Sequence, residues 1–560
     1  MRIQTASAVG FITLMLAGCT GTIGDADSSR SPDGVVPFGG QPGDPPERER
    51  GVGGMGYVRL TPSQWASGAR QLLRLTTNVD ARLSRVQPSE FHFDNDEGTL
   101  GFGAISYLQH QEAAEAVVEV RMAAADAWLI ALMPSDAPQS GVGRTEAFAR
   151  SLLKRAWRRA PSPDELAAWL KPFSDAPGAD EAAKFKAGAR RFMIALLQSP
   201  GFVYRTAVGE PVTPINDRVP LQAFELATRL SLALYDAPPD DAMLASVEAG
   251  DFSDAKLSAT VDRALSDPRA REGLLRFHEQ LYFAQEYPSL SKDATRFPGF
   301  SAGTGEHLRQ DMLRTVAAVI DSGGGLAELF STRKAFVNKA TARLYGLDPS
   351  SYSDSAYTEV TLDANRAGVL TRAGWLAWGA GPAERRQVRR GLAMLHNVMC
   401  ETYQNGEPQD FPKTFPNEAK TSRKRLEHTV SGGTCMGCHA TIINPKGFAF
   451  EHFDAVGQYQ TMDNTEPVDA SGKVFLDGAE VRFASHVELM TALAASTQAQ
   501  TCYARRMSHY LLGFEKSTLE DVLVARVVSA TKKGPVTAKD IARIVILGSA
   551  FRTRKLTEKL

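Results

Sequence analysis

The sequence predicts a mainly α-helical protein with several domains, and three observations carry this prediction. Helix start signals recur along the chain: in "SPDELAAWL", Ser162 stands at an N-cap with Pro163 and Glu165 behind it, the pattern of a capping box. Apolar residues recur at helical spacing, as in the segment that begins at Asp267 and Pro268. The chain has 560 residues, of which 43% are hydrophobic, so it is long enough for more than one core.

Stretches rich in Pro and Gly divide this helical chain. We expect one strand pair, at residues 472–485, where Asp477 and Gly478 supply the turn of a hairpin. The predicted segments are a signal peptide (1–19), a tether (20–56), helical domains at 57–142, 143–208 and 209–385, a CxxCH domain at 386–485 and a helical segment at 486–560.

The first residues have the pattern of an export signal. Arg2 precedes an apolar run over residues 6–16, which is shorter than the roughly 20 residues of a transmembrane helix. The run ends in Leu-Ala-Gly-Cys, which resembles the lipobox of bacterial lipoproteins and implies a lipid on Cys19. An ordinary secretory signal with an unrelated cysteine is the alternative. We expect a lipid-anchored protein of the cell envelope on the periplasmic or outer-membrane side, and Thr20 favours the outer membrane.

Composition and charge exclude some classes of partner. The formal net charge is −1, so there is no basic surplus to indicate nucleic-acid binding.

Residues 20–56 consist largely of Gly, Pro, Asp and Ser, which predicts a disordered tether between the lipid and the folded body. No Walker A motif appears, and the one glycine-rich run follows no strand, so the sequence predicts no nucleotide cofactor.

A Cys-x-x-Cys-His motif lies in the segment "GGTCMGCHATIINPKGF". Cys435 and Cys438 are two of only five cysteines in the chain, and His439 follows the second of them. Three explanations compete for this motif: a covalently attached haem, half of a zinc site, or a redox-active or structural disulfide.

The surroundings of the motif favour haem. A structural zinc site needs four ligands, but no second cysteine pair and no spaced pair of histidines accompanies the motif. A thioredoxin-like site needs a βαβ unit, whereas the pattern here is helical. A c-type haem needs two thiols for thioether bonds, an adjacent histidine for the iron and an exported protein. We therefore expect one covalent haem c held by Cys435, Cys438 and His439, with a non-haem structural CxxC as the alternative.

Residues after the motif are candidates to complete this site. The backbone carbonyl of Pro445 is placed to accept a hydrogen bond from the second ring nitrogen of His439, and a simple turn is the alternative. Phe448, Phe450 and Phe453 either cover the haem or pack in the ordinary core.

The sequence leaves the sixth iron ligand open. His428 precedes the motif on a charged helix, where a surface position is the alternative to ligation. Met490 and Met507 follow the motif, and core packing is the alternative for both. A methionine ligand raises the reduction potential, a histidine lowers it, and an open position permits peroxide or oxygen chemistry.

Two further cysteines flank the motif segment. Cys400 and Cys502 are expected to form a disulfide, because an oxidising compartment favours the pairing of leftover thiols. Two separate buried thiols are the alternative.

Taken in order, several motifs resemble the planctomycete-type, cytochrome c-like multidomain lipoproteins, whose segments are labelled domains of unknown function. The motifs are "LQSPGFVYR" (197–205), "FVNKATARLYGL" (336–347), "CHATIINPKGFAFEHFDAVGQY" (438–459) and "CYARRMSHYLLG" (502–513). The resemblance implies a mainly α, multidomain helical body with a C-terminal cytochrome c-like CxxCH domain and a short β-hairpin. Asn444 and Tyr235 depart from the family pattern, which usually has Asp and Trp there.

Three functions are consistent with these observations. The first is a lipid-anchored c-type cytochrome that transfers electrons to or from an unknown redox partner. The second is a haem-dependent oxidoreductase or accessory subunit that acts on an envelope substrate such as a glycan. The third is a surface lipoprotein whose CxxC is structural and binds no haem.

Overall fold

The computed structural model describes residues 57–77, 83–84, 91–101, 103–123, 127–215, 217–401, 418–431, 435–514, 520–531 and 534–556. The predicted signal peptide, Cys19 and the tether lie outside these ranges. Within them helices predominate and each sheet has two strands, so the mainly α prediction is confirmed. No helix in the described part of the chain is long and apolar enough to cross a bilayer.

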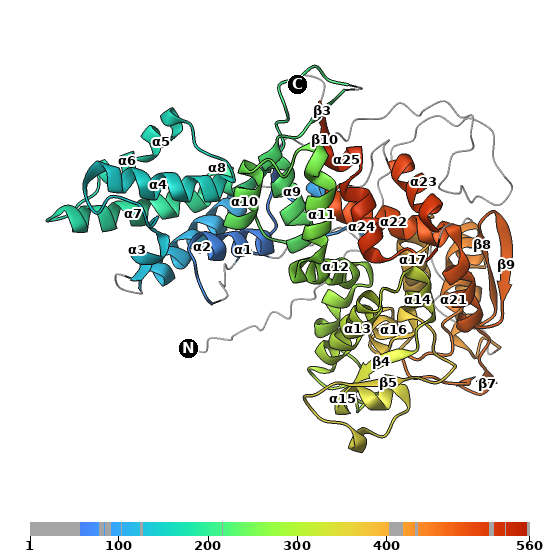
Figure 1. The fold of residues 1–560 in the computed structure, drawn as a ribbon. Helices are drawn as coiled ribbons and strands as arrows, with labels where there is room; N and C mark the ends of the chain where they lie inside the picture. The colour runs from blue at the N-terminus through green and yellow to red at the C-terminus, as the bar shows by residue number, and fades with distance from the viewer. Residues whose placement is uncertain are drawn as a thin grey trace, which may run out of the picture.

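The buried side chains form two large clusters. The first cluster holds the N-terminal lobe, drawn in blue and teal in Figure 1, around Trp65, Phe148 and Phe192. Its strand β1 (Tyr57–Arg59) pairs with β2 (Tyr204–Thr206), so the segments 57–142 and 143–208 share one core. The helices of this lobe are α1 (Pro62–Leu72), α2 (Ala104–Met122), α3 (Ala127–Leu132), α4 (Gly141–Trp157), α5 (Pro163–Trp169), α6 (Lys171–Ser174), α7 (Glu181–Gln198) and α8 (Pro200–Val203).

The second cluster contains side chains from Phe93 and from Ala207 to Phe551. It joins the central helices to the CxxCH region and to the C-terminal helices, so the later segments share one large core. Its earlier helices are α9 (Ala223–Tyr235), α10 (Asp241–Glu248), α11 (Asp254–Ser266), α12 (Pro268–Leu281), α13 (Thr304–Asp321), α14 (Leu326–Ser331), α15 (Lys339–Ala342) and α16 (Ala373–Trp378). Its later helices are α17 (Gln387–Asn397), α18 (Ser422–Thr429), α19 (Cys435–Cys438), α20 (Asn444–Phe448), α21 (His486–Ala495), α22 (Thr497–Leu512), α23 (Glu520–Thr531), α24 (Ala538–Ile546) and α25 (Ser549–Arg552).

Local signals in the sequence are confirmed where side chains meet the backbone directly. The Ser162 hydroxyl accepts from the N–H of Glu165, whose carboxylate accepts from the N–H of Ser162, and Asp267 caps α12. The predicted hairpin consists of β8 (Gly472–Leu476) and β9 (Ala479–Phe483), and Asp477 and Gly478 have positive φ values of 51° and 81°. This is the conformation that a two-residue hairpin turn requires.

The expectation of a single strand pair is wrong. The structure contains further short pairs: β3 (Arg218–Pro220) with β10 (Thr553–Lys555), β4 (Lys334–Val337) with β5 (Thr358–Thr361), and β6 (Met462–Asp463) with β7 (Glu466–Pro467). Strands of two to four residues are too short to show an alternating pattern, and β3 pairs with a strand more than 300 residues away.

Contacts between the two ends of the chain complete the second core. Strand β10 pairs antiparallel with β3, and α22 and α24 pack on the central helices, as the red and green ribbons in Figure 1 show. Nε2 of His509 lies 2.7 Å from Oδ2 of Asp96, and the side-chain amide of Asn95 donates to the carbonyl of Tyr510. Residues more than 400 positions apart thereby hold one another in place.

Candidate functional site

The CxxCH motif occupies a continuous helical segment with a change of pitch in its middle. Helix α19 contains the two cysteines, a π-helical turn runs over His439–Ile443, and α20 follows at Asn444. The N–H of Asn444 donates to the carbonyl of His439, five residues earlier. A single π-helical turn is rare and is frequently found at functional sites.

The π-turn brings two polar side chains together. Nδ1 of His439 lies 3.1 Å from Oδ1 of Asn444, whose side chain is 1% exposed. The sequence predicts the carbonyl of Pro445 for this role, and the structure gives the side chain of Asn444 instead. The physical reason is the pitch: a π-helix has more residues per turn than an α-helix, so residue i+5 lies beside residue i. Nε2 of His439 is thereby left as the ring nitrogen available to a metal.

The cysteines occupy the start of this segment. The side chain of Cys438 is half-buried and packs against a small apolar cluster of Leu395, Ile442 and Ile443. The side chain of Cys435 lies outside the described part of the structure, although its backbone begins α19.

A hollow of about 530 Å³ lies beside the motif, within the range of volumes that hold small molecules and cofactors. One wall is a stripe of the helical segment with a spacing of four residues: Met436, Ala440, Asn444 and Phe448. Pro445 also lines the hollow, and α18 and the β8–β9 hairpin form the other walls. The remaining lining residues are Arg423, Glu427, Val430, Ser431, Ser471, Gly472, Lys473, Arg482 and Phe483.

The hollow combines an apolar floor with three cationic side chains. Phe448 and Phe483 are buried, and the guanidinium of Arg423 lies 4.4 Å above the ring of Phe448. Nζ of Lys473 and Nη2 of Arg482 each lie 2.7 Å from the carboxylate of Glu480, at exposed positions on the hairpin. Such exposed pairs contribute little to stability, so these two cations can exchange partners at low cost.

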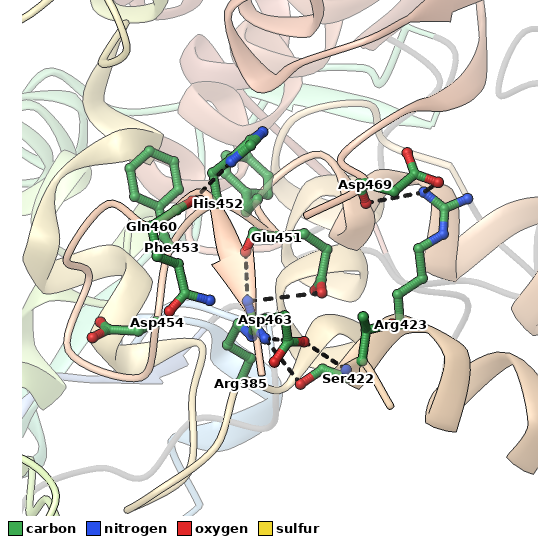
Figure 2. A network of polar contacts seen from close by, with 12 residues as sticks. Arg385, Ser422, Arg423, Glu451, His452, Phe453, Asp454, Gln460, Asp463 and Asp469 are labelled. Carbon is green, nitrogen blue, oxygen red and sulfur yellow. Dashed lines mark hydrogen bonds and ion pairs between the residues drawn. The ribbon is translucent and has the colours of Figure 1, made fainter. Parts of the chain in front are cut away.

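A polar network fixes the wall formed by α18, as Figure 2 shows. Arg385 donates through Nη1 to the carbonyl of Glu451 at 2.6 Å and forms an ion pair with Asp463. Asp463 in turn accepts from the N–H of Ser422 at the start of α18. Arg423 also contacts Asp469, which follows strand β7. The network joins α18 to the loop beyond α20, so the shape of the hollow depends on charged groups outside it.

Helices α17 and α20 approach each other through two glycines. A Cβ on Gly447 would lie 2.1 Å from the carbonyl oxygen of Gln387, and a Cβ on Gly391 would lie 2.3 Å from that of Ile443. Both distances are far shorter than van der Waals contact. Glycine is therefore required at both positions for α17 to support the motif segment at this separation.

A buried ion pair and a disulfide lie behind the same segment. Nζ of Lys446 lies 2.9 Å from Oε2 of Glu401, and their side chains are 4% and 3% exposed. Glu401 follows Cys400, which the structure joins to Cys502 on α22 by a disulfide. The motif segment is thus connected through a salt bridge and a covalent bond to the C-terminal helices.

The three candidates for a sixth ligand lie in two different settings. His428 lies at an exposed position on α18. Met490 and Met507 are fully buried in the second core, whereas Cys438 packs against a separate apolar cluster. Their methionine side chains fill space among apolar neighbours, which is the common role of methionine. Phe450 and Phe453 also lie in that core, and Phe448 alone of the three aromatics lines the hollow.

Sequence reasoning missed most of the residues that shape the hollow. From the sequence, Asn444 is noted only as a departure from a family pattern, and the basic hairpin residues Lys473 and Arg482 are not predicted to belong to a site. The i, i+4 stripe of Met436, Ala440, Asn444 and Phe448 is visible in the sequence and is the one signal that could have located the wall.

These residues fit a haem in three respects. A histidine with one ring nitrogen engaged and the other available follows a CxxC pair, as c-type ligation requires. The hollow next to the motif, lined by Asn444 but not by Cys438 or His439, has an apolar floor and cations suited to the carboxylates of a porphyrin. The amide nitrogen Nδ2 of Asn444 is buried and has no partner among the described residues, as expected of a site completed by another group.

Comparisons with known proteins give three matches to family models. Residues 144–206 match the protein of unknown function DUF1595, residues 221–347 match DUF1592, and residues 366–463 match DUF1588. All three are planctomycete-type cytochrome c-like domains whose function is not established, and the third match contains the CxxCH segment. No curated protein and no solved structure matches the chain.

Proposed function

We propose that this chain, which carries three domains of a cytochrome c-like family of unknown function, binds one covalent haem c and transfers electrons. The observation that carries the proposal is the contact between His439 and Asn444 beside a hollow with an apolar floor and a cationic rim. When bound, the haem supplies reversible one-electron exchange at its iron.

The side chains divide the work of holding this group. The thiols of Cys435 and Cys438 would form the thioether bonds, and Nε2 of His439 would bind the iron. Pro445 and Phe448 exclude water from one side of the hollow, which favours a stable apolar setting for the porphyrin. Arg423 and the hairpin cations, which are paired with Glu427, Asp469 and Glu480, would exchange these partners for its carboxylates.

The test is the presence of covalent haem in the exported protein. The full chain is produced together with a c-type haem maturation system, and the pyridine haemochrome spectrum of the purified protein is recorded. We expect a thioether-type spectrum that the variant Cys435→Ala/Cys438→Ala loses. The comparison variant is Cys400→Ala/Cys502→Ala, which removes the disulfide behind the motif segment but keeps both motif thiols. Its stability is expected to fall, and its folded fraction is expected to keep the thioether-type spectrum. A colourless wild-type protein from competent cells would refute the proposal and leave a non-haem lipoprotein with a structural CxxC.

A second candidate function is a haem-dependent oxidoreductase or accessory subunit. It is favoured by the settings of the three candidate ligands, because Met490 and Met507 are buried among apolar side chains and His428 is exposed. An open iron position takes external ligands, so added cyanide or carbon monoxide is expected to change the haem spectrum at once. A spectrum that stays unchanged identifies an electron-transfer protein with both axial positions filled. A glycan as the substrate, and the redox partner, stay predictions from the family resemblance.

The position in the cell envelope is part of the same proposal. A lipid on Cys19 would anchor the body to a membrane on the periplasmic or outer-membrane side. Metabolic labelling with a fatty acid tests this directly, since Cys19→Ala is expected to lose the label and to move from the membrane to the soluble fraction.

A further inference from the structure

We propose that Asn444 is a positioning residue that holds His439 in the iron-binding tautomer. As a neutral acceptor, it would set a higher reduction potential than a carboxylate at the same position. This inference rests on the proposed haem function and adds the residue that regulates it. It starts from one contact, the 3.1 Å between Nδ1 of His439 and Oδ1 of Asn444.

The contact has the geometry of a fixed support. Asn444 is 1% exposed, and its backbone N–H is already committed to the carbonyl of His439. Two hydrogen bonds therefore join the same pair of residues, one through the backbone and one through the side chains. Together they fix the ring of His439 relative to the helical segment that carries both cysteines.

The direction of the hydrogen bond determines the tautomer. Oδ1 can only accept, so Nδ1 of His439 carries the proton and Nε2 carries the lone pair. That is the tautomer able to bind iron through Nε2. An amide rotated by 180° would present Nδ2, which donates, and would favour the opposite tautomer. An aspartate at this position can only accept, so it retains the correct direction and changes the charge alone.

Until another group completes the site, the amide is retained at a cost to stability. Nδ2 of Asn444 is buried and has no hydrogen-bond partner among the described residues, and an unsatisfied buried donor is destabilising. A leucine of similar volume would avoid this cost. The presence of the amide is therefore explained by its contact with His439 and not by packing.

The absence of charge on the amide has a consequence for the iron. A hydrogen bond from Nδ1–H to a carboxylate raises the basicity of a ligating imidazole, which stabilises the more highly charged ferric state. A neutral amide does this more weakly, so the ferrous state is relatively favoured. Asn444 thus acts in the direction of a higher potential, and the shift does not require a change of axial ligand.

The experiment compares the midpoint potentials of haem-loaded wild type, Asn444→Asp and Asn444→Leu, measured by spectroelectrochemical titration. We expect Asn444→Asp to lower the ferrous-to-ferric ratio at a fixed applied potential about tenfold, which corresponds to 59 mV for one electron. Asn444→Leu, which removes the acceptor without adding charge, is expected to shift the potential in the opposite direction. Opposite shifts from two substitutions at one position are not the result of general structural damage.

The matched control is Asn397→Asp on α17. Asn397 is also a buried asparagine with one unpartnered side-chain atom, but its amide donates to the carbonyl of Leu281 and not to a histidine. We expect the ferrous-to-ferric ratio of Asn397→Asp at a fixed applied potential to stay within about a factor of two of the wild-type ratio. If Asn444→Asp and Asn444→Leu leave the potential unchanged, or if Asn397→Asp shifts it as much as Asn444→Asp does, the inference is wrong. Wild-type protein without haem refutes the proposed function instead, so the two failures are distinguishable.

Discussion

The buried ion pair between Lys446 and Glu401 provides a sharp test of how the motif segment is held in place. Nζ of Lys446 lies 2.9 Å from Oε2 of Glu401 and also donates to the carbonyl of Ile442 at 2.8 Å. Burial lowers the pKa of Lys446, and the attraction of Glu401 opposes this shift. The perturbation is a double-mutant cycle of Lys446→Met, Glu401→Leu and the two together.

The expected magnitudes follow from the burial of both partners. Either single substitution leaves one charge in an apolar setting that is less than 5% exposed, which costs about 3–5 kcal/mol. The double variant removes both charges and replaces them with apolar volume, which is typically neutral or stabilising. We therefore expect the pair of substitutions to recover most of the stability that either one loses, with a coupling free energy of about 3 kcal/mol or more.

Native-state hydrogen exchange of the haem-loaded protein measures this locally. The peptide that covers α20 reports the free energy of opening of the motif segment, independently of the N-terminal lobe. Peptides from α4 and α7 belong to the other core and serve as the internal control. If each single variant lowers the opening free energy of α20 by less than about 1 kcal/mol, or if the double variant loses the sum of the two, the pair does not support the segment as described.

Two further predictions concern the supports of the motif segment, and a third concerns His278, a fully buried histidine on α12. Removing the disulfide with Cys400→Ala/Cys502→Ala opens a loop of 102 residues and is expected to cost on the order of 4–5 kcal/mol in the chain-entropy model, measured as a lower urea midpoint. Gly447→Ala places a methyl group 2.1 Å from a backbone oxygen of α17 and is expected to cost about 1–3 kcal/mol by calorimetry, whereas Gly437→Ala, with no atom within 4 Å, is expected to cost nothing there; equal losses would contradict the close approach of the helices. Burial lowers the pKa of His278 to about 4 from 6.5 in the unfolded chain. The native state resists protonation in that interval, so the stabilising effect is present in full above pH 6.5 and about 3 kcal/mol is lost as the pH falls to about 4. Urea unfolding at pH 7 and pH 4.5 is expected to show that His278→Gln loses less unfolding free energy between the two pH values than the wild type does. An equal loss would show that His278 is not the source of this pH dependence.

Structural features that depend on a few consecutive residues, such as helix caps and hairpin turns, are predictable from the sequence. The cap at Ser162, the start of α12 at Asp267 and the hairpin turn at Asp477 and Gly478 each depend on side chains that contact backbone within a few positions. The same holds for the CxxCH motif as a helical segment. The disulfide between Cys400 and Cys502 is expected because the predicted compartment is oxidising and two cysteines remain outside the motif and the lipobox, not because of a local pattern.

Features that depend on helix pitch or on distant partners are not predictable in this way. The π-turn after Cys438 moves the partner of His439 from the Pro445 carbonyl to the Asn444 side chain, and no propensity indicates a one-residue change of pitch. The hollow forms where α18, α20 and the β8–β9 hairpin pack together, and the residue patterns do not predict how far apart these elements lie. The shared second core arises from contacts over hundreds of residues, which residue patterns do not report.

The pairing of β3 with β10 and of Asp96 with His509 determines when the protein can fold. Strand β3 emerges from the ribosome more than 300 residues before β10, and Asp96 more than 400 before His509. The central helices therefore have no final surface to cover their apolar faces until the last part of the chain has been made. Contacts of such large sequence separation slow folding and lengthen the exposure of apolar surface. A chain cut short before residue 500 would be a substrate for proteases and chaperones and not a smaller stable protein.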